Sequence, residues 1–183
     1  SLSVFLHRRM GLSDRLLIQD AFNLDTLSGL GDFVKKVVKG TFIVEGIGAL
    51  LYMIVFIPEF GLRGIWISVF NSISAFCNAG IDIFSESSLC DYATNPLMNL
   101  VTSLLIILGG LGYIVWWDVI RLVKGRIKGK KLGLKSLSLH SKIVLVTTAL
   151  LIFGGGICFL ALEYNNPLTI EAMNLYDKIQ VSF

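Results

Sequence analysis

Charged side chains are scarce in this 183-residue sequence, at 16%, and proline and histidine occur only three times and twice. Hydrophobic residues make up 54% of the chain, and its mean hydropathy is +0.74. Soluble domains are about 45–50% apolar on a similar count and rarely contain uninterrupted apolar runs of about 20 residues. The composition therefore excludes an ordinary soluble domain and predicts an all-α integral membrane protein.

Cysteine is also rare, and the three copies at Cys77, Cys90 and Cys158 have no CxxC spacing. This argues against a zinc site or a disulfide framework, although a Cys77–Cys90 bridge on the outer face stays open as an alternative. No nucleophile set, acid–base pair or metal cluster is visible, because Glu45 and His140 stand alone. A membrane-embedded enzyme needs convergent catalytic groups, so we interpret the chain as a non-enzyme.

Three apolar segments are long enough to cross a bilayer as helices, since about 20 residues are needed. The predicted spans are 37–57, 97–117 and 143–162. A fourth segment, 62–76, is too short to span and is followed at once by small residues, an amide and a glycine. We therefore predict a re-entrant pore helix over 62–76, with Trp66 and Phe70 packed against the neighbouring spans.

Several residues carry expectations about helix ends and about packing. The stretch Pro58-Glu59-Phe60-Gly61 is expected to end the first span with an outer turn, and Asn95 with Pro96 to begin the second. Small residues let helices approach closely in lipid, so the Gly-Gly-Leu-Gly run at 109–112 is expected to serve helix packing. The Trp116–Trp117 pair is expected to lie in an interfacial aromatic belt.

Glu45 lies inside the first predicted span, where a carboxylate is costly. Two interpretations stay open. The carboxylate could serve a functional site, or it could pair with Lys39 or with a neighbouring helix near the cytoplasmic end.

Basic residues are distributed very unevenly about the spans. Of the 16 Lys and Arg residues, all but Arg63 and Lys178 precede the first span, lie in its first turn as Lys39 does, or fall between the second and third. The positive-inside rule places those segments in the cytoplasm and the pore loop on the outer side of a multi-pass plasma-membrane protein. Residues 1–36 are then a cytosolic or interfacial linker, and 120–142 form a basic cytosolic loop. This loop contains no aromatic residue, so contact with anionic lipid is favoured over nucleic-acid binding.

The stretch after the short helix indicates an ion-pore loop. Non-helical backbone survives at membrane depth only where it is buried in protein or lines a watery cavity. There its carbonyl oxygens can replace the water around a cation. At this point the sequence Ser74-Ala75-Phe76-Cys77-Asn78-Ala79-Gly80 resembles the second pore loop of the Trk/Ktr-type potassium transporters, a superfamily shared with the plant HKT proteins. The chain departs from that pattern at Ile81, where the family has an aromatic residue, and at Asp82, where Ser or Thr is expected.

The resemblance covers residues 10–183 and extends to the stretches at 11–21, 109–112 and 138–142. It implies four helix–pore-loop–helix repeats around a potassium path, of which 37–119 is one complete repeat. Residues 143–183 would be the first span and outer linker of the next repeat. A chain with one complete repeat and no initiator Met is expected to be a piece of a longer protein.

We predict that the selectivity filter spans 77–81. The backbone carbonyls expected to face the ion are those of Cys77, Asn78, Ala79 and Gly80. Gly80 is expected to need a positive φ, which glycine adopts without steric cost. Ser74 and Ile81 are expected to support the loop.

These features predict one quarter of a filter for potassium uptake across the cell membrane, with potassium as the substrate, sodium as a candidate coupling ion and no covalent cofactor. The resemblance further implies a homodimer and a cytosolic nucleotide-binding regulatory ring. A secondary carrier with a broken helix at its substrate site stays open as the alternative. A tetrameric potassium channel subunit would need a complete Thr-Val-Gly-Tyr-Gly filter, which the sequence lacks.

Overall fold

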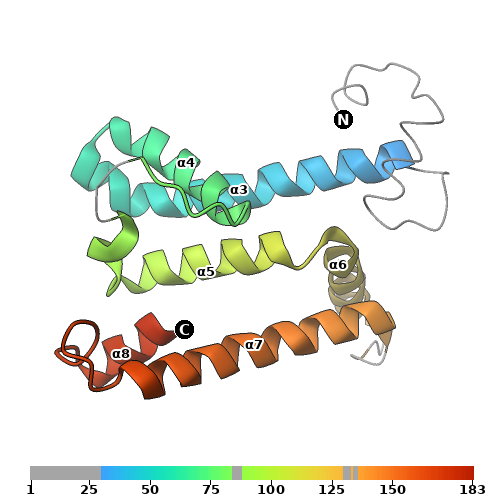
Figure 1. Cartoon of the computed structure of the whole chain (residues 1–183). Helices are drawn as coiled ribbons and strands as arrows, with labels where there is room; N and C mark the ends of the chain where they lie inside the picture. Colours follow the sequence, from blue (N-terminus) through green and yellow to red (C-terminus); the bar gives the residue numbers. More distant parts are fainter. Residues whose placement is uncertain (1–29, 84–87, 130–132, 134–135) are drawn as a thin grey trace. The chain divides into compact units, whose positions relative to one another are not determined.

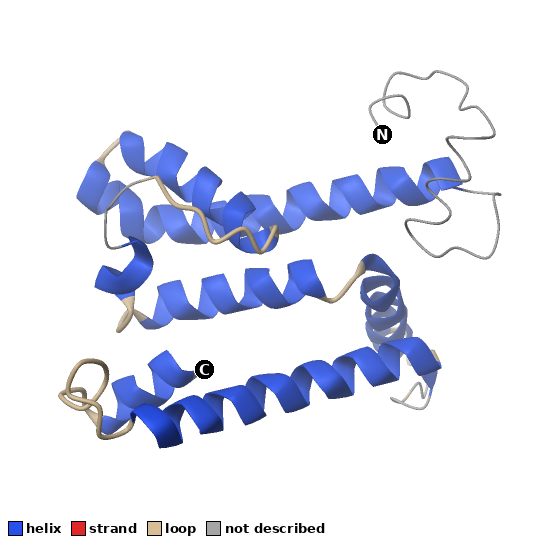
Figure 2. Ribbon diagram, in the orientation of Figure 1, coloured by secondary structure: helices blue, strands red, loops and turns tan. Residues whose placement is uncertain are grey.

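The computed structural model describes residues 30–83, 88–129, 133 and 136–183, and these residues form helices joined by turns (Figures 1 and 2). The elements are α3 (Leu30–Phe60), α4 (Arg63–Phe76), η1 (Ser88–Tyr92), α5 (Pro96–Gly110), α6 (Tyr113–Ile127), α7 (Leu139–Glu163) and α8 (Leu175–Ser182). No strand occurs within these ranges, and the all-α prediction is confirmed. Most of the linker predicted over 1–36 lies outside the described residues.

The chain forms two compact units, residues 1–46 and 47–183, and the boundary between them falls inside α3. The predicted pore helix, filter and second span all lie in the second unit. Glu45 lies in the first unit. The site can therefore be described from the second unit alone.

Two helices are long and apolar enough to cross a membrane, over Phe33–Phe60 within α3 and Leu139–Glu163 in α7. The first predicted span lies inside α3, which contains Pro58 and ends at Phe60, within the stretch 58–61 that was expected to end it. A proline in the last turn removes only one backbone donor. Gly61 then ends the helix with φ +58°, and its N–H donates to the carbonyl of Ile57 at 2.8 Å.

Helix α4 begins one residue after the predicted start of the pore helix and ends at the predicted residue, Phe76. Its most deeply packed side is formed by Gly64, Ile67, Ser68, Asn71 and Ser72. Gly64 allows close contact with the end of α3, because a Cβ there would lie 2.4 Å from the carbonyl oxygen of Phe56. Trp66 lies off this side and is 63% exposed, so its predicted packing against the spans is wrong for the described part of the chain.

The continuous helix expected over 97–117 is not observed. Helix α5 begins at Pro96, where the second span was expected to start, and Asn95 caps it, since its side-chain oxygen accepts from the N–H groups of Leu97 and Met98 at 3.0 and 3.2 Å. Helix α5 stops at Gly110, however, and α6 leaves at an angle of 108°. Gly112 sits at the break with φ +77°, a conformation that favours glycine over residues with a Cβ. The pair makes a third membrane span only if the two bent helices are counted as one.

Helix α7 begins at Leu139 and contains the third predicted span. Ser138 caps it by accepting from the N–H of Ser141 at 3.2 Å, and His140 lies in its first turn, as expected of a helix-start residue. After α7 the chain turns into α8, which lies within the segment expected to open the next repeat. Lys178 of α8 is buried and donates to the carbonyl oxygen of Tyr164 at 2.9 Å.

Candidate functional site

The loop that follows α4 is not helical, and residues 77–81 are exposed. Gly80 has φ +64°, which confirms the conformation expected for it, and Asn78 has φ +54°, which the sequence analysis did not foresee. Asparagine is among the few non-glycine residues that enter this region readily. Two left-handed residues separated by one position prevent the loop from continuing as either a helix or a regular strand.

The loop turns its N–H groups back toward the pore helix. The N–H groups of Cys77, Asn78 and Ala79 donate to the carbonyls of Ile73, Ala75 and Ser74 at 2.9, 3.1 and 2.9 Å. Within the described ranges, the carbonyl oxygens of residues 77–80 accept no hydrogen bond from another part of the chain. The loop therefore uses three of its N–H groups internally, while its carbonyl oxygens lie in exposed residues.

Ser74 braces the loop from the last turn of α4. Its hydroxyl donates to the carbonyl oxygen of Ile81 at 2.6 Å and accepts from the N–H of Ile81 at 2.9 Å. The structure thus brings together the two residues expected to support the filter. Both backbone groups of Ile81 are satisfied by one side chain, which fixes where the loop ends.

We expect Ser74→Ala to loosen the loop, because the substitution removes both hydrogen bonds to the Ile81 backbone, each worth about 0.5–1.5 kcal/mol. Hydrogen exchange of the Ile81 amide in the full-length protein should accelerate. Ser68→Ala is the matched control, since the buried Ser68 hydroxyl donates only to the pore helix's own Gly64 carbonyl at 2.7 Å. Unchanged Ile81 exchange in Ser74→Ala would contradict the brace.

A cavity of about 190 Å³ lies beside the loop. Its walls comprise Tyr52, Asn71, Ser74, Ala75, Asn78, Gly80, Ile81, Asp82, Ser88, Leu89, Thr102 and Ile106. Tyr52 is almost fully buried, and its phenolic oxygen shares a hydrogen bond with the Thr102 hydroxyl at 2.7 Å. The lining combines these polar groups with a larger apolar surface. The cavity leaves space beside the loop instead of packing it tightly.

The end of α4 meets the glycine run of α5 at very close range. A Cβ on Gly109 would lie 1.8 Å from the carbonyl oxygen of Phe76 and 3.3 Å from the side-chain nitrogen of Asn78. The predicted use of these glycines for close packing is confirmed at this position. The sequence did not reveal that the partner would be the end of the pore helix.

Trp116 also packs against this region. Its ring meets the Phe76 ring edge-on, with centroids 5.9 Å apart and planes at 81°, and its indole N–H donates to the Leu108 carbonyl at 2.9 Å. The pair Trp116–Trp117 was expected to serve as a membrane-interface belt. Trp116 contacts the residue that precedes the predicted filter, and its place at the membrane interface stays a prediction. The one signal in the sequence for this contact with Phe76 is the position of Trp116, four residues after Gly112.

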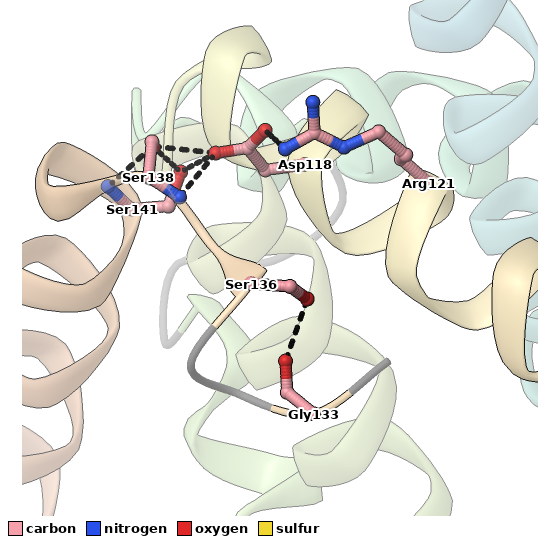
Figure 3. Close-up of polar contacts among 6 residues, drawn as sticks. All are labelled: Asp118, Arg121, Gly133, Ser136, Ser138 and Ser141. Carbon is pink, nitrogen blue, oxygen red and sulfur yellow. Dashed lines mark hydrogen bonds and ion pairs between the residues drawn. The ribbon is translucent and has the colours of Figure 1, made fainter. Parts of the chain in front are cut away.

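Asp118 joins α6 to the start of α7 (Figure 3). One carboxylate oxygen accepts from the hydroxyls of Ser138 and Ser141, the latter at 2.6 Å, and from the Ser138 N–H at 3.2 Å. The other oxygen pairs with Arg121 at 2.8 Å. The hydrogen bonds from Ser138 and Ser141 lower the pKa of Asp118, so the carboxylate is ionised at neutral pH. A negative charge is favourable at a helix N-terminus, and the junction is stabilised accordingly.

The remaining candidate residues are placed elsewhere. Cys77, Cys90 and Cys158 are exposed and form no disulfide, so the alternative of a Cys77–Cys90 bridge is not supported. Among the described residues, no group of three or more His, Cys, Asp and Glu side chains could hold a metal ion. Part of the basic loop at 120–142 lies outside the described ranges.

Comparison with known proteins identifies the family. A family model described as TrkH, cation transport protein, matches residues 22–175. The potassium/sodium uptake protein NtpJ of Enterococcus hirae is 41% identical over 177 residues, which are 96% of this chain and 37% of that protein. The Ktr system potassium uptake protein B of Bacillus subtilis is 34% identical over 181 residues, covering 98% of this chain and 38% of that protein.

The protein of the same name from Vibrio alginolyticus is 34% identical over 166 residues, covering 90% of this chain and 35% of that protein. The chain therefore spans little more than one third of the length of these relatives. The match nevertheless includes every element of the second unit up to the start of α8. The chain belongs to the TrkH family of cation transport proteins.

Proposed function

We propose that this chain is part of a transporter that takes up potassium across the cell membrane, and that residues 77–81 supply one quarter of its selectivity filter. One observation carries the proposal. The loop turns its N–H groups onto α4, while the exposed carbonyls of residues 77–80 accept no hydrogen bond within the described ranges. Carbonyl oxygens available in this way can replace the hydration shell of a cation.

The surrounding geometry supports cation binding by this loop. The C-terminal end of α4, at Phe76, carries the negative end of the helix dipole and leads directly into the loop. The membrane potential would then draw the ion inward, by about 2.3 kcal/mol per charge for each 100 mV. The chemistry is transfer of an ion between two sets of oxygen ligands, with no covalent step and no covalent cofactor.

The identity of the ion is inferred from the relatives. Two of the three relatives described above are named as potassium uptake proteins and one as a potassium/sodium uptake protein. Potassium is therefore the proposed substrate, with sodium as a candidate coupling ion. None of these names describes an enzyme.

A complete pore needs more than this chain. We propose that three further repeats of the full-length protein complete the filter and that the protein forms a homodimer in the lipid bilayer. The basic segment 120–142 would face the cytoplasm and would be available to a nucleotide-binding regulatory ring. The pore loop would open to the outside.

A secondary carrier is the second candidate, because the 108° break between α5 and α6 resembles the broken helices of carrier substrate sites. The two functions differ in how flux responds to ions on the far side. A carrier exchanges substrates, so internal potassium accelerates uptake of external tracer at zero potential. A pore responds chiefly to the imposed potential.

The proposal is tested with the full-length protein in liposomes that carry an imposed inside-negative potential. Uptake of potassium and of sodium is measured separately, and protein-free liposomes provide the background. We expect uptake driven by the potential and strongly preferring potassium. Absence of cation flux would refute the proposal, and acceleration by internal potassium at zero potential would favour the carrier.

A further inference from the structure

Trp116 repairs the backbone where the second helix pair is broken. In an uninterrupted helix the Leu108 carbonyl would accept from the N–H of residue 112, four positions later. Gly112 has instead left the helical conformation, with φ +77°. The indole N–H of Trp116 donates to the Leu108 carbonyl at 2.9 Å. One side chain thereby supplies a donor that the break would otherwise remove from the end of α5.

The same side chain contacts the last residue of the pore helix. Phe76 is 6% exposed, and Trp116 lies edge-on to it at 5.9 Å. The Tyr113 ring also contacts Trp116, with centroids 5.4 Å apart and planes at 58°. Edge-on aromatic pairs contribute beyond the area they bury, and they restrict the orientation of both rings. Trp116 is therefore fixed by contacts to three separate turns of the chain.

Phe76 transmits these contacts to the loop because it immediately precedes Cys77. Its carbonyl oxygen lies so close to Gly109 that no Cβ fits between them. Losing the contact between the Trp116 and Phe76 rings would remove one restraint on this residue and allow the backbone from which the loop starts to be displaced. A displacement of this kind would change the positions of the loop's carbonyl oxygens, which are the groups that coordinate the ion.

We propose that Trp116 is a positioning residue for the filter. Trp116 sets the ion preference by holding the end of α4 against the end of α5. The inference rests on the proposed function of residues 77–81. Trp116 is not placed in contact with the ion, and it acts through Phe76. Asp118, two positions further along α6, ties the same helix to the start of α7. Trp116 is thus presented from a helix that is fixed on its other side.

The test compares Trp116→Phe and Trp116→Leu with the same two substitutions at Trp117, in the full-length protein reconstituted in liposomes. Trp117 is the matched control because its indole nitrogen is buried and has no hydrogen-bond partner among the described residues. The readout is the ratio of potassium to sodium uptake per inserted protein. Loss of fold stability alone lowers the amount of active protein and leaves that ratio unchanged.

We expect Trp116→Leu to lower the ratio by about fivefold or more, because it removes both the hydrogen bond and the ring pair. Trp116→Phe keeps a ring but lacks the donor, so we expect a smaller loss, with both Trp117 variants close to wild type. An unchanged ratio in Trp116→Leu, or an equal loss in Trp117→Leu, would overturn the inference. If Trp116→Leu does not insert into the membrane, Trp116→Phe is compared with Trp117→Phe. An unchanged ratio in Trp116→Phe, or an equal loss in Trp117→Phe, would then overturn the inference. Wild-type protein without potassium flux would instead refute the proposed function itself.

Discussion

Gly80→Val is expected to remove the preference for potassium in the full-length protein while leaving membrane insertion intact. Gly80 has φ +64°, and a Cβ built there would meet nothing within 4 Å. The effect therefore arises from the backbone, because β-branched residues strongly disfavour this region, at a cost of about 1–2 kcal/mol. To avoid the strain, the peptide planes on both sides of residue 80 would rotate and turn their carbonyls away from the ion.

The change should lower the ratio of potassium to sodium uptake by about tenfold, since 1.4 kcal/mol corresponds to that factor. Gly61→Val provides a close control. Gly61 has φ +58° and equally open surroundings, but it lies in the turn between α3 and α4. Both variants carry the same backbone strain, and only Gly80 belongs to the loop. Normal potassium preference in Gly80→Val, or an equal loss in Gly61→Val, would remove residues 77–81 from the filter.

The local signals of this sequence were sufficient to predict helix α4 and the start of α5. Length alone distinguished the short helix α4 from the spans, and its end at Phe76 was predicted because small residues and a glycine follow. Asn95 before Pro96 predicted the start of α5 correctly, because an N-cap is decided by residues within one turn. The positive φ of Gly80 was likewise a local property.

The features that were missed depend on contacts between distant residues. The glycines at 109–112 were interpreted as packing residues inside one span, because a glycine run predicts close approach equally well in straight and in broken helices. The break at Gly112 is compensated by the Trp116 indole, and hydropathy gives no sign of that hydrogen bond. Asp118 meets Ser138 across 20 residues, a separation at which no helical periodicity links them. The spacing of Trp66 and Phe70 indicated that the two residues share one side of the helix, but it did not show which side would be covered. Trp66 is exposed.

Gly109→Ala is expected to destabilise the full-length protein by about 1–3 kcal/mol, the usual cost of overpacking a close contact, and to reduce potassium uptake with it. The added Cβ would lie 1.8 Å from the Phe76 carbonyl oxygen, far inside the 3.0 Å below which something must shift. The obstacle is backbone, which cannot rotate away as the tip of a flexible side chain would. The end of α4 must therefore move away from α5 and carry Cys77 with it.

Gly110→Ala isolates this effect from the general consequence of replacing glycine in a helix. A Cβ on Gly110 would meet only the side-chain nitrogen of Asn78, at the ordinary contact distance of 4.0 Å. Exchanging glycine for alanine in a helix stabilises by about 0.5–1 kcal/mol when the space is free, so this neighbour should be neutral or more stable. Thermal unfolding of the detergent-solubilised protein and potassium uptake in liposomes measure the two variants side by side. Equal unfolding temperatures for Gly109→Ala and Gly110→Ala would contradict the prediction. Alanine would then be tolerated at position 109, where the structure leaves no room for a Cβ, and α4 would not depend on the Phe76–Gly109 contact.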